Sequence, residues 1–446
     1  MALNGIQIFK MTPKTNCKDC GSPTCMAFAM KVAQGAVDIS KCPHMAQEAL
    51  DALSEATAPP MKTIKVGTGE AEYTMGGETV LFRHEKTFVN KPRYAVTLCS
   101  CCDEAVNDEL IANLQKVDYD RIGERMHVEM IYVNYKEGTA DKYVELVKKA
   151  AGLNRTLILG CKDVEVAKAA LEVCKEFKPV LNGADASNYA EMNEVAKAAG
   201  VVLGVSGANL DELYDTVAAL EKAGNKNLVL DTTFANAKEA FAGTVQVRRA
   251  ALKNEDRTFG YPTLVNVAAL APEDAYLQAA YASMFTMKYG SIIVLSAMDY
   301  SDALPLFGLR QNVYTDPQKP MRVEPGIYPI NGADENSLCL TTVDFALTYF
   351  VVSGELERSG VPCNLLISDA GGLSVLTAWA AGKLSSTTVA DFIKEQVEGK
   401  IACRKLVLPG KVAVLKGDIE AKLPGWEIIV GPREAVDLVK FLKEQA

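Results

Sequence analysis

Four cysteines near the start of the chain have the spacing of a metal site. Cys17, Cys20 and Cys25 are spaced C-x2-C-x4-C, and Cys42 follows after sixteen further residues, directly before Pro43. Four thiolates hold either a tetrahedral zinc ion or an iron–sulfur cluster. Zinc sites with four cysteines usually consist of two C-x2-C pairs, whereas here three cysteines share one loop. This asymmetry favours a [4Fe–4S] cluster, with zinc as the alternative, although the spacing matches the common ferredoxin patterns only in part.

The elements around these cysteines predict a small domain. Gly21 and Pro23 allow the ligand loop to turn around a cluster. The helical spacing of residues 26–37 predicts a helix that shields the cluster from water. A second predicted helix ends at Pro59. We therefore expect a cluster domain over residues 1–58, which is too small to act on a substrate alone and supplies electrons to another site.

The composition predicts a soluble globular protein of two or three domains. The chain has 446 residues, of which 49% are hydrophobic and 23% are charged. Its net charge of -9 argues against a nucleic-acid or anionic-membrane partner, because phosphate binding relies on clustered Lys and Arg. The longest apolar run, residues 345–352, is far shorter than a membrane helix, and we recognise no signal peptide. We expect a cytoplasmic protein whose twelve cysteines are not a disulfide framework.

The middle of the chain alternates short apolar runs with amphipathic helical patterns. Eight such runs begin at residues 94, 127, 156, 179, 201, 227, 263 and 291. Runs that are apolar without alternation fit strands buried on both faces, as in parallel sheets. Eight units of this kind predict a central (β/α)8 TIM barrel over residues 59–325. An open doubly wound sheet is the alternative.

Polar side chains follow several of these strands, where the functional loops of a barrel lie. Side chains of this kind can bind a pterin or a sugar, and they are Asn182, Asp185, Ser187, Asn188, Ser206, Asn209, Asp231, Thr232, Thr233 and Asp299. The favoured interpretation of Asn209, Ser187 and Asp163 is a structural one, in which they cap the N-termini of helices.

A second group of cysteines, Cys99, Cys101 and Cys102, lies at the end of the first apolar run. Cys99 and Cys101 would share one face of a strand and Cys102 would lie on the other. The three thiols can therefore converge on a metal ion only if the strand has ended. The favoured interpretation is ordinary buried cysteines, as for Cys161 and Cys174.

After a connector rich in Pro and Gly, the pattern predicts a Rossmann-like α/β domain over residues 326–446. Its expected strands include residues 364–368, 405–408, 412–416 and 426–430, and residues 338–350 are expected to form a helix. The turn at Gly371 and Gly372 would let a ligand approach the backbone, and Pro432 after Gly431 would begin a helix. The ligand would be a nucleotide, a flavin or a corrinoid, and a purely structural glycine turn is an open alternative.

Over its whole length the chain resembles the large (gamma) subunit of the corrinoid iron–sulfur protein of the reductive acetyl-CoA (Wood–Ljungdahl) pathway. The likeness extends from "GIQIFKMTPKTNCKDCGSPTCMAFAMKVAQG" through the barrel to "ISDAGGLSVLTAW" and "IIVGPREA". It implies a [4Fe–4S] cluster on Cys17, Cys20, Cys25 and Cys42, and a base-off, cobalamin-type corrinoid with cobalt in the carboxy-terminal domain. The D-x-H-x-x-G signature of histidine-ligated corrinoid proteins is missing, and no histidine follows His127. Both absences agree with base-off binding.

The resemblance also implies a methyl carrier rather than a complete enzyme. In the family, cobalt(I) accepts a methyl group from methyltetrahydrofolate through a separate methyltransferase and donates it to acetyl-CoA synthase/CO dehydrogenase. The cluster reduces cobalt(II) that forms by accident, and a small subunit completes a heterodimer. The residues expected to contact the corrinoid are Leu340, Thr341, Thr342, Ala346, Ala370, Gly371, Gly372, Leu373, Ser374, Gly431 and Arg433.

Two other functions fit these residues. A barrel methyltransferase would itself bind methyltetrahydropterin near Asn182, Asp185 and Asp231. A plain electron-transfer protein would hold the cluster without a corrinoid. Titration of the isolated chain with methyltetrahydrofolate tests the first, and the visible spectrum of a corrinoid tests the second.

Overall fold

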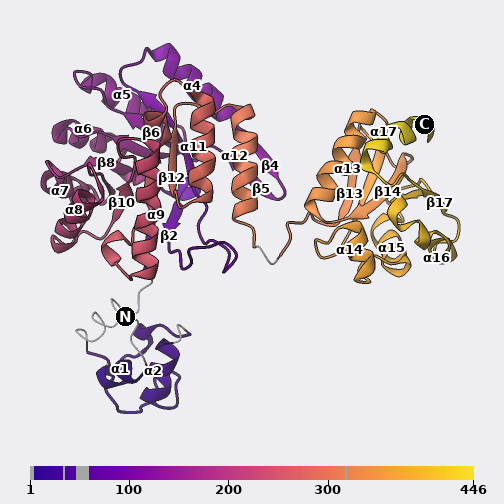
Figure 1. Ribbon diagram of the computed structural model, residues 1–446, viewed down its shortest axis with the longest axis horizontal. Helices are drawn as coiled ribbons and strands as arrows, with labels where there is room; N and C mark the ends of the chain where they lie inside the picture. Colours follow the sequence, from indigo (N-terminus) through magenta and orange to yellow (C-terminus); the bar gives the residue numbers. More distant parts are fainter. Residues whose placement is uncertain (1–4, 34–35, 47–59, 317–318, 446) are drawn as a thin grey trace. The chain divides into compact units, whose positions relative to one another are not determined.

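The computed structural model describes residues 5–33, 36–46, 60–316 and 319–445. The chain folds into two compact units, Met1–Val117 with His127–Tyr314 and Asp118–Met126 with Thr315–Ala446. Figure 1 shows the helices and strands of both units. The domain limit expected after residue 58, and the helix expected to end at Pro59, lie outside the described residues. No helix in the described ranges is both long enough and apolar enough to span a bilayer.

Two short helices and one turn form the first described part of the chain: α1 (Gly5–Met11), α2 (Cys25–Ala33) and the 3-10 turn η1 (Ile39–Lys41). Their buried side chains form a small apolar cluster, which includes Ile8, Phe28, Ala29, Val32 and Ile39. The two helices approach closely at Gly5, where an added Cβ would meet the sulfur of Met30 at 2.3 Å. The helix α2 is the one that the sequence predicted after the ligand loop.

Eight parallel strands close a barrel in the order β10-β11-β12-β3-β6-β7-β8-β9, so that successive strands are neighbours. They are β3 (Arg93–Cys99), β6 (Met130–Asn134), β7 (Thr156–Gly160), β8 (Val180–Ala184), β9 (Val202–Val205), β10 (Leu228–Asp231), β11 (Thr263–Asn266) and β12 (Ile292–Leu295). Most of their residues are buried, which explains the lack of polar alternation. The predicted (β/α)8 barrel is confirmed, and each strand overlaps one of the eight apolar runs.

Helices connect the strands and surround the barrel (Figure 1). They are α4 (Glu104–Lys116), α5 (Ala140–Ala151), α6 (Val164–Cys174), α7 (Tyr189–Ala199), α8 (Leu210–Lys222), α9 (Ala237–Lys253), α10 (Val267–Leu270), α11 (Ala275–Met287) and α12 (Tyr300–Val313). The side chains of Asp163 and Asn209 accept hydrogen bonds from N–H groups in the first turns of α6 and α8. Their predicted role as N-caps is therefore confirmed. The same prediction is wrong for Ser187, because α7 begins after Asn188 and the Ser187 hydroxyl donates to Asp185.

An antiparallel hairpin of β1 (Thr63–Val66) and β2 (Tyr73–Gly76) contacts segments that lead into the barrel strands. The N–H of Gly67 donates to Lys178 O at 2.9 Å, just before β8, and the N–H of Lys62 donates to Gly260 O at 2.7 Å, just before β11. These bonds place the hairpin at the amino-terminal end of the barrel, the end opposite the one where barrel enzymes bind substrate.

The carboxy-terminal sheet has five strands in the order β13-β15-β14-β16-β17. They are β13 (Gly326–Ile330), β14 (Leu338–Val343), β15 (Cys363–Ser368), β16 (Lys405–Leu408) and β17 (Glu427–Val430), of which β13 is antiparallel to its neighbour and the others are parallel. Among the parallel strands the order is 2-1-3-4, as in flavodoxin-like sheets, whereas a dinucleotide-binding sheet has the order 3-2-1-4-5-6.

The helical segments that pack on this sheet are α13 (Ala346–Ser359), α14 (Val375–Ala380), α15 (Ser386–Phe392), the π-helical turn η5 (Ile393–Val397), the 3-10 turn η6 (Gly410–Leu415), α16 (Lys416–Lys422), the turn η7 (Ala435–Asp437) and α17 (Leu438–Gln445).

Three sequence-based predictions for this part of the chain are wrong. Residues 338–343 form the strand β14, because this segment lies between β15 and β16, and residues 412–415 form η6 rather than a strand. The helical turn after β17 begins at Ala435, so Pro432 does not start it.

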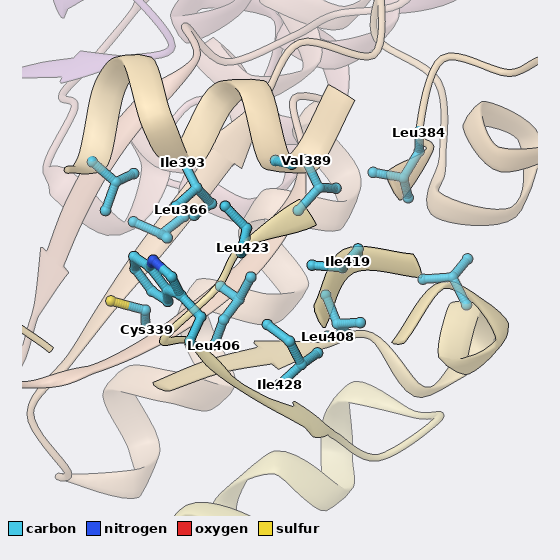
Figure 2. Close-up of a cluster of buried hydrophobic side chains, with 14 of the residues drawn as sticks. Cys339, Leu366, Leu384, Val389, Ile393, Leu406, Leu408, Ile419, Leu423 and Ile428 are labelled. Atoms are coloured by element: carbon cyan, nitrogen blue, oxygen red, sulfur yellow. The ribbon is translucent and has the colours of Figure 1, made fainter. Parts of the chain in front are cut away.

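Two apolar cores lie on opposite faces of this sheet. Figure 2 shows the first, where Leu366, Leu406 and Ile428 of the strands pack against Ile393 and Ile419. The second core joins other strand residues to α13 and α17, and its members include Leu340, Leu356, Leu365, Ile367, Val407, Leu438 and Leu442. Successive strand residues such as Leu365, Leu366 and Ile367 belong alternately to the two cores, and helices cover both faces, so the arrangement is a three-layer α/β/α one.

A two-stranded hairpin, β4 (Asp118–Arg121) and β5 (Glu124–His127), is inserted between α4 and β6 of the barrel. Most of this hairpin, Asp118–Met126, belongs to the second unit. Within that unit, the guanidinium of Arg121 lies 4.8 Å from the ring centroid of Phe350 on α13. Such a cation–π contact adds a favourable interaction of the hairpin with α13.

Candidate functional site

The loop that carries Cys17 has an unusual backbone. The φ angles of Lys14, Asn16 and Lys18 are 59°, 50° and 70°, and the residues between them do not share the positive sign. Non-glycine residues of this kind cost about 1–3 kcal/mol each and are concentrated at functional sites. Alternating signs of φ turn backbone N–H groups toward one side of the chain and form an anion-binding concavity, as at phosphate and Fe–S sites. The loop is therefore preorganised for a negatively charged group.

Two of the four predicted ligands are buried against the apolar cluster of this region. Cys25 begins α2, and its N–H donates to Asn16 Oδ1 at 2.8 Å, while the N–H of Asn16 donates to Cys25 Sγ at 3.4 Å. Cys42 follows η1, and its N–H donates to Ile39 O at 3.2 Å. Cys17 is exposed and Cys20 is half-buried. The set thus has two thiols that face the protein interior and two nearer to solvent.

The spacing of these sulfurs in space does not suit a single ion. A zinc ion with Zn–S bonds of 2.3 Å brings four tetrahedral sulfurs to about 3.8 Å from one another. In the described residues, no three of the four sulfurs lie within 4.8 Å of one another. The Cys17 sulfur instead lies within 4.8 Å of a carboxylate oxygen of Asp19 and a ring nitrogen of His44. Asp19 Oδ2 and His44 Nε2 are 2.6 Å apart. This hydrogen bond, which lowers the pKa of Asp19, joins the ligand loop to the segment after Cys42.

A cavity of about 490 Å³ opens at the carboxyl ends of β14, β16 and β17. Six of the eleven residues predicted to bind a corrinoid line it: Leu340, Thr341, Thr342, Ser374, Gly431 and Arg433. The strands β15 and β16 lie on opposite sides of β14, so the chain order reverses direction beside this strand. Ligands of open α/β sheets bind at such a switch point, outside the carboxyl ends of the strands.

Two hydroxyl groups in the lining have no hydrogen-bond partner in the described part of the chain. They are the Oγ1 atoms of Thr341 and Thr342, whose residues are 5% and 3% exposed. A buried polar group without a partner costs about 1–3 kcal/mol, so native proteins rarely leave one. Leu340 belongs to the core on the α13 face of the sheet, so Thr342 lies on the same face of β14 and Thr341 on the other.

The glycine turn after β15 does not line the cavity. Asp344, which is fully buried, accepts hydrogen bonds from the N–H groups of Ala370 at 3.0 Å and Gly372 at 3.0 Å. The φ angles of Gly371 and Gly372 are 68° and 74°, so the turn needs glycine for its conformation. A Cβ at Gly372 would lie 3.1 Å from Pro320 O. The carboxylate of Asp344 therefore shapes the turn, a role that sequence reasoning missed.

Of the eleven predicted residues, Ala346, Ala370, Gly371, Gly372 and Leu373 are not part of the cavity lining. Ala346 is buried at the start of α13, where its N–H donates to Met321 O at 3.0 Å. Their contact with a cofactor stays a prediction.

An exposed apolar rim surrounds the cavity and was also missed. Leu347 and Val351 on α13, Leu376 on α14 and Val436 on η7 line the opening and are 63%, 50%, 47% and 61% exposed. The spacing of Leu347 and Val351, one helical turn apart, is a signal for one helix face. This spacing alone does not identify a cavity rim, because the rim also needs η7, which the strand order places at the same end of the sheet as α13.

The polar residues at the carboxyl end of the barrel bind one another. Asn182 Nδ2 donates to Asp231 Oδ2 at 2.8 Å, and the N–H of Thr233 donates to Asp231 Oδ1 at 3.0 Å. Burial raises the pKa of Asp231, and these hydrogen bonds oppose the rise. Asp185 is paired with Lys162 at 2.7 Å. The carboxylates that were considered for a pterin or a sugar are thus satisfied within the protein.

Two family models match the chain. The model described as "CO dehydrogenase/acetyl-CoA synthase delta subunit" matches residues 63–442, which include the barrel and most of the carboxy-terminal sheet with its helices. The model described as "Putative Fe-S cluster" matches residues 13–44, which include all four cysteines of the ligand loop.

Curated relatives are similar over nearly the whole chain. The corrinoid/iron-sulfur protein large subunit of Moorella thermoacetica is 38% identical over 448 residues, which cover 99% of each chain. The acetyl-CoA decarbonylase/synthase complex subunit gamma of Methanopyrus kandleri is 33% identical and covers 99% of this chain and 98% of its own length. Among solved structures, dihydropteroate synthase from Thermus thermophilus is 17% identical, with a TM-score of 0.39 over 50% of this chain and 95% of that chain.

Proposed function

This chain belongs to the family of corrinoid/iron–sulfur protein large subunits and acetyl-CoA decarbonylase/synthase gamma subunits, and on that premise we propose that it is a methyl carrier of the acetyl-CoA pathway. It binds a corrinoid in the cavity of the carboxy-terminal sheet and an iron–sulfur cluster on the amino-terminal cysteines. The observation that carries the proposal is the cavity at the switch point, in which Thr341 and Thr342 have no hydrogen-bond partner in the described residues.

The lining suits a large ring with an apolar body and amide side chains. Leu340 and Val351 offer apolar contacts, and the hydroxyl of Thr342, on the same face of β14 as Leu340, offers a hydrogen bond to an amide at the edge of the ring. No residue of the lining is a histidine. The lining therefore supplies no imidazole as a lower ligand to cobalt, which supports a base-off corrinoid.

A corrinoid held in this cavity would supply a cobalt that can take a methyl group from methyltetrahydrofolate, through a separate methyltransferase, and give it to acetyl-CoA synthase. A cluster on the amino-terminal cysteines would supply the electrons that restore oxidised cobalt. The residues of this chain hold the ring, leave its lower face without imidazole and expose its surroundings to a partner. The exposed apolar side chains of Leu347, Leu376 and Val436 at the rim are the kind of surface that a partner buries, which supports the proposal that a small subunit covers the cavity.

The amino-terminal cysteines are assigned to a [4Fe–4S] cluster on two grounds. Sulfurs that do not gather within 4.8 Å leave room for a cluster larger than one zinc ion. The alternating φ signs around Cys17 direct backbone N–H groups toward an anionic centre, and such hydrogen bonds to cluster sulfurs raise its reduction potential. The ligands are Cys17, Cys20, Cys25 and Cys42.

The alternative function, a barrel that binds methyltetrahydropterin directly, has less support. Asp231 already accepts hydrogen bonds from Asn182 and Thr233, and Asp185 is paired with Lys162. A pterin would have to displace these contacts before it could use the carboxylates.

The deciding experiment compares Cys20→Ala with the wild type, both purified without oxygen together with the small subunit. We expect the variant to lose the cluster's iron and its reductive reactivation, but to keep cobalt and to accept methyl groups when it is reduced chemically. Cys403→Ala is the matched control, because Cys403 is also half-buried and lies in the other unit. Wild-type protein that contains zinc instead of iron, or no cobalt, would refute the proposal.

A further inference from the structure

Three cysteines at the carboxyl end of the barrel come together in a way that the sequence did not predict. The strand β3 ends at Cys99, so the side chains of Cys101 and Cys102 need not point to opposite faces of the sheet. The three Sγ atoms lie within 4.8 Å of one another. Cys101 is exposed, and Cys99 and Cys102 are half-buried. The expectation of ordinary buried cysteines is therefore wrong for these three, whereas it is confirmed for Cys161 and Cys174.

We propose that, in the reduced protein, Cys99, Cys101 and Cys102 bind one thiophilic d10 metal ion of the zinc(II) class. Sulfurs bound to a tetrahedral ion at 2.3 Å are about 3.8 Å apart. Cys99 and Cys101 are joined by a disulfide here and would have to separate on reduction, and Cys102 Sγ lies within 4.8 Å of both. The amino-terminal cysteines do not form such a group. None of the three residues belongs to the proposed cluster or to the corrinoid cavity, so this inference does not depend on the proposed function.

Two hydrogen-bond donors contact the sulfur of Cys99. Its Sγ accepts a hydrogen bond from the N–H of Cys101 at 3.3 Å and from Asn134 Nδ2, at the end of β6, at 3.6 Å. These donors hold the Cys99 side chain at the end of β3. The 13-residue helix α4 begins directly after Asp103, and its N-terminus adds a positive partial charge next to Cys102.

The backbone that carries the three thiols is held in place. Asn107 on α4 is 4% exposed, and its side chain accepts from the N–H of Cys99 at 3.2 Å and donates to Cys99 O at 3.0 Å. These two bonds fix the end of β3 relative to α4. A site whose ligands are positioned by buried hydrogen bonds loses little freedom when a metal ion binds.

Solvent reaches the site from one side. A hollow of about 720 Å³ is lined by Ser100, Cys102, Asp103, Glu104 and Asn107, together with residues of α5 that include lysines and Glu145. Lys149 of this lining is paired with Glu104 at 3.2 Å and with Asp108. An ion can therefore enter beside Cys102, and water can occupy the position that three protein ligands leave open on a tetrahedral ion.

The structure holds the oxidised form of this group, because Cys99 and Cys101 are joined by a disulfide and Cys102 is a free thiol. A phosphine reductant converts the disulfide to two thiols and takes up one oxygen atom from water, so that the phosphine is oxidised to its oxide. Binding of zinc(II) then forms three Zn–S bonds and releases the protons of the thiols to solvent.

The test uses the anaerobic holoprotein with its cluster intact. After reduction with a phosphine, zinc chloride is added, free metal is removed, and zinc and iron are measured per chain. We expect one additional zinc per chain with iron unchanged, and at least about a tenfold weaker zinc affinity in Cys101→Ser and Cys102→Ser. Cys161→Ser is the matched control, since Cys161 lies at the same end of the barrel and Ser can keep its hydrogen bond to Asp163 O.

A second measurement does not depend on the variants. Trypsin cleavage after Arg93 and Lys116 gives the peptide of residues 94–116, which contains Cys99, Cys101 and Cys102 and no other cysteine. Alkylation before digestion should modify all three thiols in the reduced, metal-free protein and fewer when zinc is present. Equal alkylation with and without zinc, or equal zinc binding by the wild type and both serine variants, would overturn the proposal.

Discussion

The barrel and the carboxy-terminal sheet have carboxyl ends of opposite character. At the end of the barrel, Asn182 and Thr233 donate hydrogen bonds to the half-buried carboxylate of Asp231. At the end of the sheet, Thr341 and Thr342 line a cavity of about 490 Å³, and their hydroxyls have no partner in the described residues. Both ends are positions where α/β proteins bind ligands. Position in the fold alone therefore does not mark a ligand site. The hydroxyls without a partner in the described residues distinguish the proposed cofactor site from the end of the barrel.

The largest effect is expected from closing the cavity. Ser374→Trp places an indole in the cavity lining. It removes the hydrogen bond between the hydroxyls of Ser374 and Thr377 at 2.9 Å, which the control Thr377→Trp also removes, and Ser374 caps no backbone N–H of α14. Overpacking of this kind costs about 1–3 kcal/mol or more, so cobalt bound per chain should fall about tenfold or more at limiting corrinoid. Metal analysis of the purified heterodimer measures the change.

Thr377→Trp is the matched control for this variant. Thr377 is exposed on the same helix and does not line the cavity, so its cobalt content should equal that of the wild type. If Ser374→Trp also kept its cobalt, the corrinoid would bind elsewhere, and the contrast between the two carboxyl ends would lose its functional meaning.

A smaller effect, on stability alone, is expected at the barrel. Asn182→Ala removes the donor to Asp231 Oδ2 and leaves an oxygen of this half-buried carboxylate without that hydrogen bond. The free energy of unfolding of the barrel should fall by about 1–3 kcal/mol, with cobalt content unchanged. Urea unfolding followed by two independent probes measures this change, because a chain with several units need not unfold in one step.

Ser206→Ala is the control at the same end of the barrel. The Ser206 hydroxyl donates only to the neutral carbonyl of Ala184 at 3.2 Å, so its loss should cost less than the loss of Asn182. Loss of cobalt in Asn182→Ala, with stability retained, would instead assign a ligand to the barrel.

The barrel was predictable from the sequence because its signals are local. Each strand is a short apolar run, and the side chains of Asp163 and Asn209 cap helices that directly follow them in the chain. The hairpins of β1 with β2 and of β4 with β5 were not predicted. Their strands have four residues each, and segments such as Asp118–Arg121 contain too few apolar residues to signal a strand.

The carboxy-terminal site was only partly predictable because it depends on distant neighbours. Residues 338–343 were expected to be helical, since the apolar spacing continues into α13, and only the pairing with β15 and β16 makes them a strand. Leu347 and Val436 are far apart in the sequence and meet at the cavity for the same reason. The grouping of Cys99 with Cys102 likewise depends on where β3 ends, which the sequence does not mark.

The smallest change gives the sharpest comparison. Thr342→Val keeps the shape of the side chain and removes a hydroxyl that has no partner in the described protein. Stability should stay the same or rise by up to about 1–3 kcal/mol, whereas corrinoid affinity should fall about threefold to tenfold through the loss of one hydrogen bond. Thr244→Val is the control, because the Thr244 hydroxyl is bonded to Thr232 Oγ1 at 2.7 Å and to Ala240 O at 2.8 Å, so its removal should destabilise the protein. If both variants lost stability equally, the Thr342 hydroxyl would have a hydrogen-bond partner within the protein. The carboxyl end of the sheet would then, like that of the barrel, have no hydroxyl left for a ligand.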